Sequence, residues 1–178
     1  MSEVRSTQQG PYARVLGEAY WSLHPAVRRA HEAPLSARGT LAVEHGRQWW
    51  TPLLVHVMRL PAAGAGQPVR LEVRSSEARL AWVRQIGSSP LRTVQFAEGP
   101  RLVEQSGIGR VTFDLTVREG ALLYCQHAFH VAGLRVPRAI APDVQASVAA
   151  AEDGWCVSVK VSWRGSLVCR YTGIISAV

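Results

Sequence analysis

The sequence predicts a mainly β protein, an up-and-down antiparallel β-barrel of the calycin or lipocalin kind with about ten strands. From residue 69 almost to the end, apolar and polar residues alternate with a period of two, which is typical of strands with one buried face. Turn sequences such as Arg118-Glu119-Gly120 and Glu152-Asp153-Gly154 join these runs into hairpins. Ten sequential antiparallel strands hide their edges most simply by closing into a barrel.

Helical segments precede and interrupt the strands. Residues 11–32 have helical spacing, and Pro25 favours the start of a second short helix over 26–31, which Pro34 ends. A first strand is expected at 39–45, and residues 49–60 return to a helical stripe. This helix lies between the first two strands and is placed to cap one mouth of the barrel. The other strands are expected at 69–74, 79–86, 91–97, 101–105, 109–118, 121–131, 144–151, 155–163 and 166–174.

An open, curved sheet wrapped around a long helix is the competing architecture. It would require a long C-terminal helix, but residues 166–178 alternate as a strand does. A chain of 178 residues has the size of one domain. We therefore expect a disordered tail over 1–10 and a single barrel domain over 11–178. A barrel with this number of strands has room for a small apolar ligand.

Composition and charge exclude several classes of protein. The chain is 47% hydrophobic and 19% charged, which excludes a disordered chain. Its formal charge is +7, but the arginines are scattered along the sequence, so nucleic-acid binding ranks low. The polar N-terminus does not resemble a signal peptide, and no apolar run is long enough to span a bilayer. The three cysteines lack CxxC spacing, which favours reduced thiols and a cytoplasmic, soluble protein.

Several short motifs in their order resemble a bacterial domain-of-unknown-function family, number 4166, from Tyr12 to Ile174. The matching residues are Leu16-Gly17-Glu18, Leu23, Pro25, Val27-Arg28, His31, Gly39, Leu60-Pro61, Gly64, Trp82, Arg84, Arg101-Leu102-Val103-Glu104, Leu134, Val136-Pro137-Arg138-Ala139 and Pro142. The sequence departs from the family pattern at Ile86, where the family usually carries an aromatic residue. The resemblance implies one compact domain and supplies no catalytic residues.

Glu104, His127 and Arg84 are the candidate catalytic residues. Arg84 shares a strand face with Trp82, so Arg84 and Glu104 would pair inside the barrel if both faces are internal. Such a pair can orient an anionic or carbonyl group of a ligand, or it can be a structural tie across the barrel wall. The odd positions of 111–131 are mostly apolar, which predicts that His127 faces inward and could transfer a proton. A core or strand-end histidine bonded to a backbone carbonyl is the alternative.

Aromatic and apolar residues supply the predicted walls of the binding site. Tryptophan offers a flat apolar surface with one hydrogen-bond donor, which suits a pocket for a ring system, although ordinary packing explains the same residues. Strand parity places His45 with the apolar residues of the first strand. The predicted substrate-binding residues are Trp82, Trp50, His45, Phe113, Cys125 and Phe129.

The histidine spacing matches no metal-binding motif, and the sequence lacks a phosphate-binding loop and a GxSxG elbow. We therefore expect no metal and no cofactor. The first hypothesis is a cofactor-independent cyclase or isomerase of specialised metabolism that acts on a hydrophobic polyketide- or terpenoid-like intermediate. The alternative is a non-catalytic carrier of a lipid or another small molecule. The expected partner is a hydrophobic small molecule, with no nucleic acid and no membrane span, and a homodimer is compatible with either hypothesis.

Overall fold

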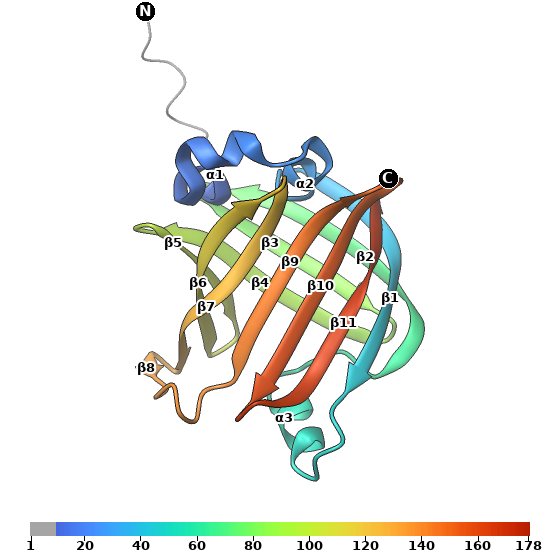
Figure 1. The fold of residues 1–178 in the computed structure, drawn as a ribbon, viewed down its shortest axis with the longest axis vertical. Coiled ribbons are helices and arrows are strands. Elements are labelled where there is room, and N and C mark those ends of the chain that lie inside the picture. Colours follow the sequence, from blue (N-terminus) through green and yellow to red (C-terminus); the bar gives the residue numbers. More distant parts are fainter. Residues whose placement is uncertain (1–9) are drawn as a thin grey trace, which may run out of the picture.

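The computed structural model describes residues 10–178, and these residues form a closed antiparallel β-barrel of ten strands with one short extra strand (Figure 1). The predicted fold class is thus confirmed. Most of the predicted tail, residues 1–9, lies outside the described residues. No helix within 10–178 is both long and apolar enough to cross a bilayer.

The strands follow one another around the barrel in sequence order, and the first pairs with the last, from Ala37↔Ala177 to His45↔Cys169. The short β8 pairs only with the end of β7, so β7 and β9 are neighbours in the barrel wall. The strands are β1 (Leu35–His45), β2 (Gly64–Ser76), β3 (Arg79–Ile86), β4 (Ser89–Glu98), β5 (Arg101–Ser106), β6 (Gly109–Arg118), β7 (Ala121–Val131), β8 (Leu134–Arg135), β9 (Asp143–Ala151), β10 (Gly154–Trp163) and β11 (Ser166–Ala177).

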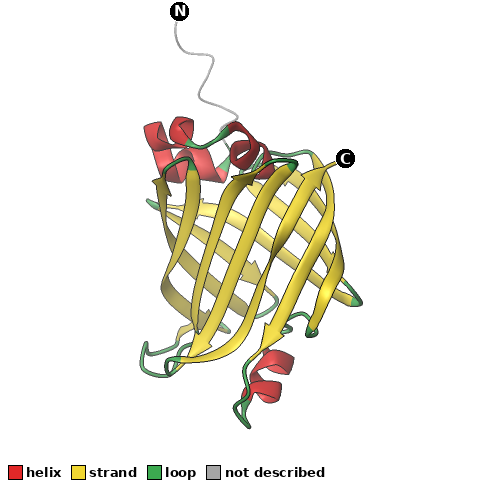
Figure 2. Cartoon of the chain, turned by 45° about the vertical axis from the view of Figure 1, so that its right-hand side comes forward, coloured by secondary structure: helices red, strands yellow, loops and turns green. Residues whose placement is uncertain are grey.

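The N-terminal segment closes one end of the barrel (Figures 1 and 2). It consists of α1 (Pro11–Leu16), the 3-10 helix η1 (Gly17–Ser22) and α2 (Pro25–Ala30). Pro25 occupies the first turn of α2, where its missing N–H costs nothing, and the His24 side chain accepts a hydrogen bond from the Ala26 amide. The His24 amide donates to the Gly120 carbonyl in the β6–β7 turn. Tyr12 and Val27 are buried, so we call this segment the plug.

The predicted capping helix is present at the opposite end as α3 (Thr51–Val57), between β1 and β2. It is shorter than the apolar stripe from which it was predicted. Trp50 precedes it and packs edge-on against Trp163 of β10, with ring centroids 4.9 Å apart. This contact holds the helix beside the barrel wall.

Candidate functional site

The barrel encloses a cavity of about 640 Å³ between the plug and α3. Its walls are mostly aliphatic and aromatic side chains from the inward positions of nearly every strand. Ligand pockets in proteins have volumes of about 300–1,000 Å³ and walls of this kind. Arg59, Arg84 and Glu104 are the ionised side chains among the lining residues of the described chain, and they give the cavity a formal charge of +1.

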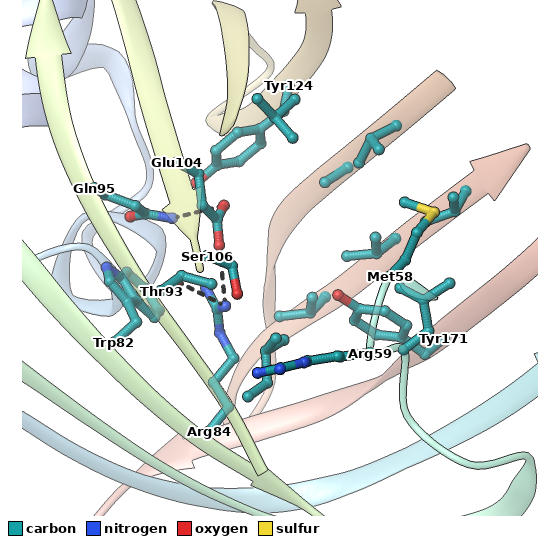
Figure 3. A pocket seen from close by; sticks show the side chains of 18 of the residues that line it. Met58, Arg59, Trp82, Arg84, Thr93, Gln95, Glu104, Ser106, Tyr124 and Tyr171 are labelled. Atoms are coloured by element: carbon teal, nitrogen blue, oxygen red, sulfur yellow. Dashed lines mark hydrogen bonds and ion pairs between the residues drawn. The ribbon is translucent and has the colours of Figure 1, made fainter. Parts of the chain in front are cut away.

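Three neighbouring strands place a row of polar groups on the cavity wall (Figure 3). Arg84 lies on β3 and its Nη1 donates to Glu104 Oε1 on β5 at 3.1 Å and to Thr93 Oγ1 on β4 at 3.2 Å. Gln95 on β4 donates from Nε2 to the second carboxylate oxygen of Glu104 at 3.0 Å. The β4–β5 register sets Gln95 opposite Glu104, so strand pairing itself brings these side chains together.

The Arg84–Glu104 pair is ionised and partly open to the cavity. Burial disfavours the charge on Arg84, but the neighbouring Glu104 carboxylate outweighs burial and raises the pKa of the guanidinium. Burial likewise raises the pKa of Glu104, and Arg84, Thr93 and Gln95 reverse this effect to a net lowering. The two side chains keep 20% and 22% of their surface exposed, and this surface faces the cavity that they line. Nε and Nη2 of Arg84 have no protein partner within residues 10–178 and are not sealed off, so they are free to meet a ligand.

The polar row continues into the plug. The Tyr12 hydroxyl donates to Gln95 Oε1 at 2.6 Å and lies 3.0 Å from the hydroxyl of Tyr124. Tyr124 is 2.7 Å from Nε2 of His31, whose Nδ1 lies 2.6 Å from the Val27 carbonyl. A carbonyl can only accept, so Nδ1 carries the ring proton. The Tyr12 hydroxyl uses its own proton for Gln95, so Nε2 of His31 and the Tyr12 oxygen are alternative acceptors for the single proton of Tyr124.

Burial determines the protonation of this plug cluster. It lowers the pKa of His31 to about 4, so the imidazole is neutral near pH 7. Burial also raises the pKa of both Tyr12 and Tyr124. The chain of hydrogen bonds from the plug therefore ends at one ionised acceptor, Glu104, whose two oxygens are both occupied.

Five of the predicted site residues line the cavity, namely Glu104, Arg84, Trp82, Phe113 and Phe129. The expected pairing of Arg84 with Glu104 is present, and the Arg84 guanidinium also stacks over the Trp82 ring at 4.7 Å. Whether any of the five contacts a substrate stays a prediction.

The predicted inward orientation of His127 and Cys125 is wrong. In the β6–β7 pairing, Thr112 is opposite Ala128 and Phe113 is opposite Gln126, so β7 has an extra residue at His127. Such a bulge reverses the side-chain alternation of the strand that contains it. Before the bulge the even positions face inward, after it Phe129 does, and Cys125 is exposed. His127 lies on the outer surface with its Nδ1 3.1 Å from Asp114 Oδ2.

His45 and Trp50 are near the barrel mouth but are not among the residues that line the cavity. His45 follows the predicted parity of β1, yet its Nε2 bonds the Pro61 carbonyl at 2.8 Å. This is the strand-end histidine of the alternative interpretation. Trp50 packs against Trp163 instead of forming a wall of the cavity.

Sequence reasoning missed several polar residues of the cavity. Tyr12 and His31 belong to the plug, and no periodicity indicates that a helix will insert polar side chains into a barrel end. The one available signal was His31 among the motifs of the resembled family. Tyr171 of β11 also lines the cavity, and burial raises the pKa of its hydroxyl to about 12. Arg59 follows α3 with a φ of 53° and extends its side chain into the cavity (Figure 3).

The fold and the site define a closed β-barrel with a large apolar interior and a buried arginine–glutamate pair. Residues 23–174 match the family model described as Domain of unknown function (DUF4166). The chain belongs to this family, which confirms the resemblance inferred from its motifs.

A solved structure shares the fold. It is the crystal structure of a protein with unknown function from the DUF3598 family, from Nostoc punctiforme, with a TM-score of 0.53 and 13% sequence identity. The match covers 82% of this chain and 47% of that one, so this chain spans about half of the length of the Nostoc protein. The comparison with curated proteins finds no match. Both matches are to proteins of unknown function, so they support the fold and assign no activity.

Proposed function

We propose that the barrel binds a hydrophobic small molecule that carries one anionic or carbonyl oxygen group. The observation that carries the proposal is an apolar cavity of about 640 Å³ whose charged lining groups are two arginines and one carboxylate. The apolar walls would bury the body of the ligand, and the free donors of Arg84 would take its oxygen group. Glu104 then acts as the fixed counter-ion that holds Arg84 in place, because its lowered pKa and two occupied oxygens suit an acceptor better than a proton donor.

Fluorescence titration with cis-parinaric acid and with its methyl ester tests this proposal. Hydrogen bonds to charged groups contribute about 1.5–3 kcal/mol, so Arg84→Met should weaken binding of the acid roughly 10- to 150-fold. Binding of the ester should weaken less, because its carbonyl accepts a hydrogen bond but carries no charge. Arg101→Gln is the matched control, because Arg101 pairs with Asp114 on the outer surface. Failure of the wild-type protein to bind either probe, or an Arg84→Met protein that binds the acid as tightly as the wild type does, would contradict the proposal.

Tyr171 favours a second function, a cofactor-independent cyclase or isomerase acting on a polyketide- or terpenoid-like intermediate. Its hydroxyl lines the cavity, stays protonated because burial raises its pKa to about 12, and makes no hydrogen bond to another side chain within residues 10–178. Figure 3 shows this hydroxyl directed toward the part of the cavity that Arg84 occupies. A protonated phenol and a guanidinium can together stabilise an oxygen on which negative charge develops, and the fixed cavity can hold a flexible substrate in a reactive shape.

The two functions differ in what happens to the bound molecule. A carrier returns its ligand unchanged, whereas an isomerase or cyclase returns a rearranged product of equal mass. Mass spectrometry and chromatography of the extracted ligand after incubation separate the two outcomes. If the chain is an enzyme, Tyr171→Phe should lower turnover strongly and leave binding of the substrate nearly unchanged, because the phenyl ring still fills the same wall.

A further inference from the structure

The two ends of the barrel differ sharply in charge. The end that contains α3 comprises the connecting residues 46–63, 87–88, 107–108, 132–142 and 164–165, and we call it the α3 end. These residues include five arginines and no carboxylate. The plug end, residues 11–34 with the turns 77–78, 99–100, 119–120 and 152–153, has three arginines and six carboxylates.

The five arginines of the α3 end are exposed, and none of them has a carboxylate within 4.0 Å in the described part of the chain. They are Arg47, Arg59, Arg135, Arg138 and Arg164. Their charge is therefore available to a negatively charged partner.

The same end carries most of the exposed large hydrophobic side chains. Trp49, two residues before α3, is 88% exposed, and the others lie on α3, on the β5–β6 turn and on the segment around β8. They are Leu53, Val57, Ile108, Val131, Leu134 and Ile140. Exposed apolar patches of this kind mark sites of interaction with proteins or membranes.

The cavity opens through this apolar and basic surface. Val57 and Ile108 line the cavity and are nevertheless 65% and 71% exposed, so they stand where the interior meets the outside. Arg59 lies at the same rim. The opposite end is filled by buried plug residues such as Tyr12 and His31.

We propose that the α3 end docks on the surface of an anionic lipid bilayer, with Trp49 and Leu53 inserted at the headgroup level and the arginines on the lipid phosphates. Tryptophan and aliphatic side chains interleaved with arginines are the composition of interfacial membrane anchors. Docking in this orientation would set the cavity mouth against the apolar phase from which a hydrophobic ligand must come. The docking surface itself does not depend on the proposed ligand.

Two other occupants fit this surface less well. A second copy bound through the same face would bring together two ends that each have a formal charge of +5, which is repulsive. Nucleic acid would satisfy the arginines but would leave aliphatic side chains such as Leu53 and Leu134 without an apolar partner. A bilayer satisfies both kinds of side chain at once.

Vesicle co-sedimentation of the full chain without added ligand tests the proposal. We expect the protein to partition onto vesicles of equal parts phosphatidylglycerol and phosphatidylcholine, to bind pure phosphatidylcholine weakly, and to be released by salt. Arg47→Gln with Arg138→Gln should lower partitioning roughly 25-fold, about fivefold per charge. Trp49→Ser should lower it roughly tenfold through the lost apolar insertion.

Matched variants at the plug end provide the controls. Trp21 is 61% exposed there, beside Arg28. Trp21→Ser and the pair Arg28→Gln with Arg29→Gln should leave partitioning within about twofold of wild type, because this end would face away from the bilayer.

The proposal is overturned if the wild type does not bind the anionic vesicles, or if plug-end variants lose as much binding as α3-end variants. Binding to single-stranded DNA that Arg47→Gln with Arg138→Gln abolishes, without vesicle binding, would assign the surface to nucleic acid instead. Because no ligand is added, failure here leaves the cis-parinaric acid result unaffected.

Discussion

Glu104→Gln is the most informative substitution in this barrel, because it removes one charge and keeps the shape of the side chain. Arg84 would then be a guanidinium on the cavity wall with no ionised partner, since its hydrogen bonds go only to Glu104 and Thr93. The new amide nitrogen would also require a rearrangement. Gln95 presents its own N–H₂ to Glu104 and uses its carbonyl for Tyr12, so two donors would meet unless Gln95 turns over and disturbs that hydrogen bond.

The size of the effect follows from the burial of the pair. Removing one partner of a buried ion pair costs about 3–5 kcal/mol. Arg84 and Glu104 keep about a fifth of their surface open to the cavity, so we expect the lower end of this range, about 3 kcal/mol. For a chain of this length, that loss corresponds to a fall in melting temperature of roughly 6–12 °C.

Urea unfolding followed by tryptophan fluorescence gives the free energy of unfolding for wild type, Glu104→Gln, Arg84→Met and the double variant. If the unpaired charge is the cause, the double variant should be more stable than the sum of the single effects predicts, by about 1–3 kcal/mol. Additive single effects would refute this reasoning, and so would a Glu104→Gln protein as stable as the wild type. An unchanged m value is the control that all four proteins unfold from equally compact states.

Three further predictions concern positions away from this pair. Burial lowers the pKa of His31 to about 4. Below the ordinary histidine pKa of about 6.5, the unfolded chain therefore binds more protons than the folded chain. The free energy of unfolding should then fall as the pH is lowered from about 6.5 to 4, by up to about 3 kcal/mol. His31→Gln should flatten this part of the pH profile of unfolding, and an equally steep profile would assign the loss to other groups. His127→Ala, on the outer surface beside Asp114, should change stability by less than about 0.5 kcal/mol and leave ligand titrations unchanged, whereas strong loss of binding would contradict its outward placement. Gly39→Ala should lower the melting temperature, because the added methyl would meet the Ile174 carbonyl and lie 2.8 Å from Ile175 Cα; a wild-type melting curve would show that β1 and β11 can separate without cost.

The barrel was predictable because its signal is repeated. Each strand buries alternate residues against one interior, so every alternating segment carries the same period, and short turns force neighbouring strands to pair. The predicted ranges 79–86, 109–118 and 121–131 coincide with β3, β6 and β7. The two-residue β8 was not predicted, because a strand of that length has no period to detect.

The site was predictable only where one strand's parity held without interruption. On β3 it did, and Arg84 and Trp82 face the cavity together. On β7 the bulge at His127 reversed the parity within the strand. The odd positions of β7 are mostly apolar both before and after the bulge. The apolar pattern therefore did not reveal that the inward-facing positions change from even to odd at His127. A bulge is fixed by how two strands pair, and this information is not local to either strand.

The plug was not predictable as part of the site because its contacts span the whole chain. The hydroxyls of Tyr12 and Tyr124 meet across 112 positions of sequence, and Tyr12 reaches Gln95 across 83. Helical spacing predicts that residues 11–32 have an apolar side. It does not indicate that the partner of that side is the open end of a barrel.

The net charge of +7 also acquires a different meaning in the folded chain. Along the sequence the arginines are scattered, which ranks nucleic-acid binding low. In the barrel, several arginines on the strands are paired with carboxylates, among them Arg74 with Glu72 and Arg101 with Asp114. Those of the α3 end have no carboxylate partner in the described residues, and they lie at the end of the barrel where Arg59 lines the apolar cavity. Charge that is dispersed in sequence is thus concentrated by topology, since alternate connections of an up-and-down barrel all fall at the same end.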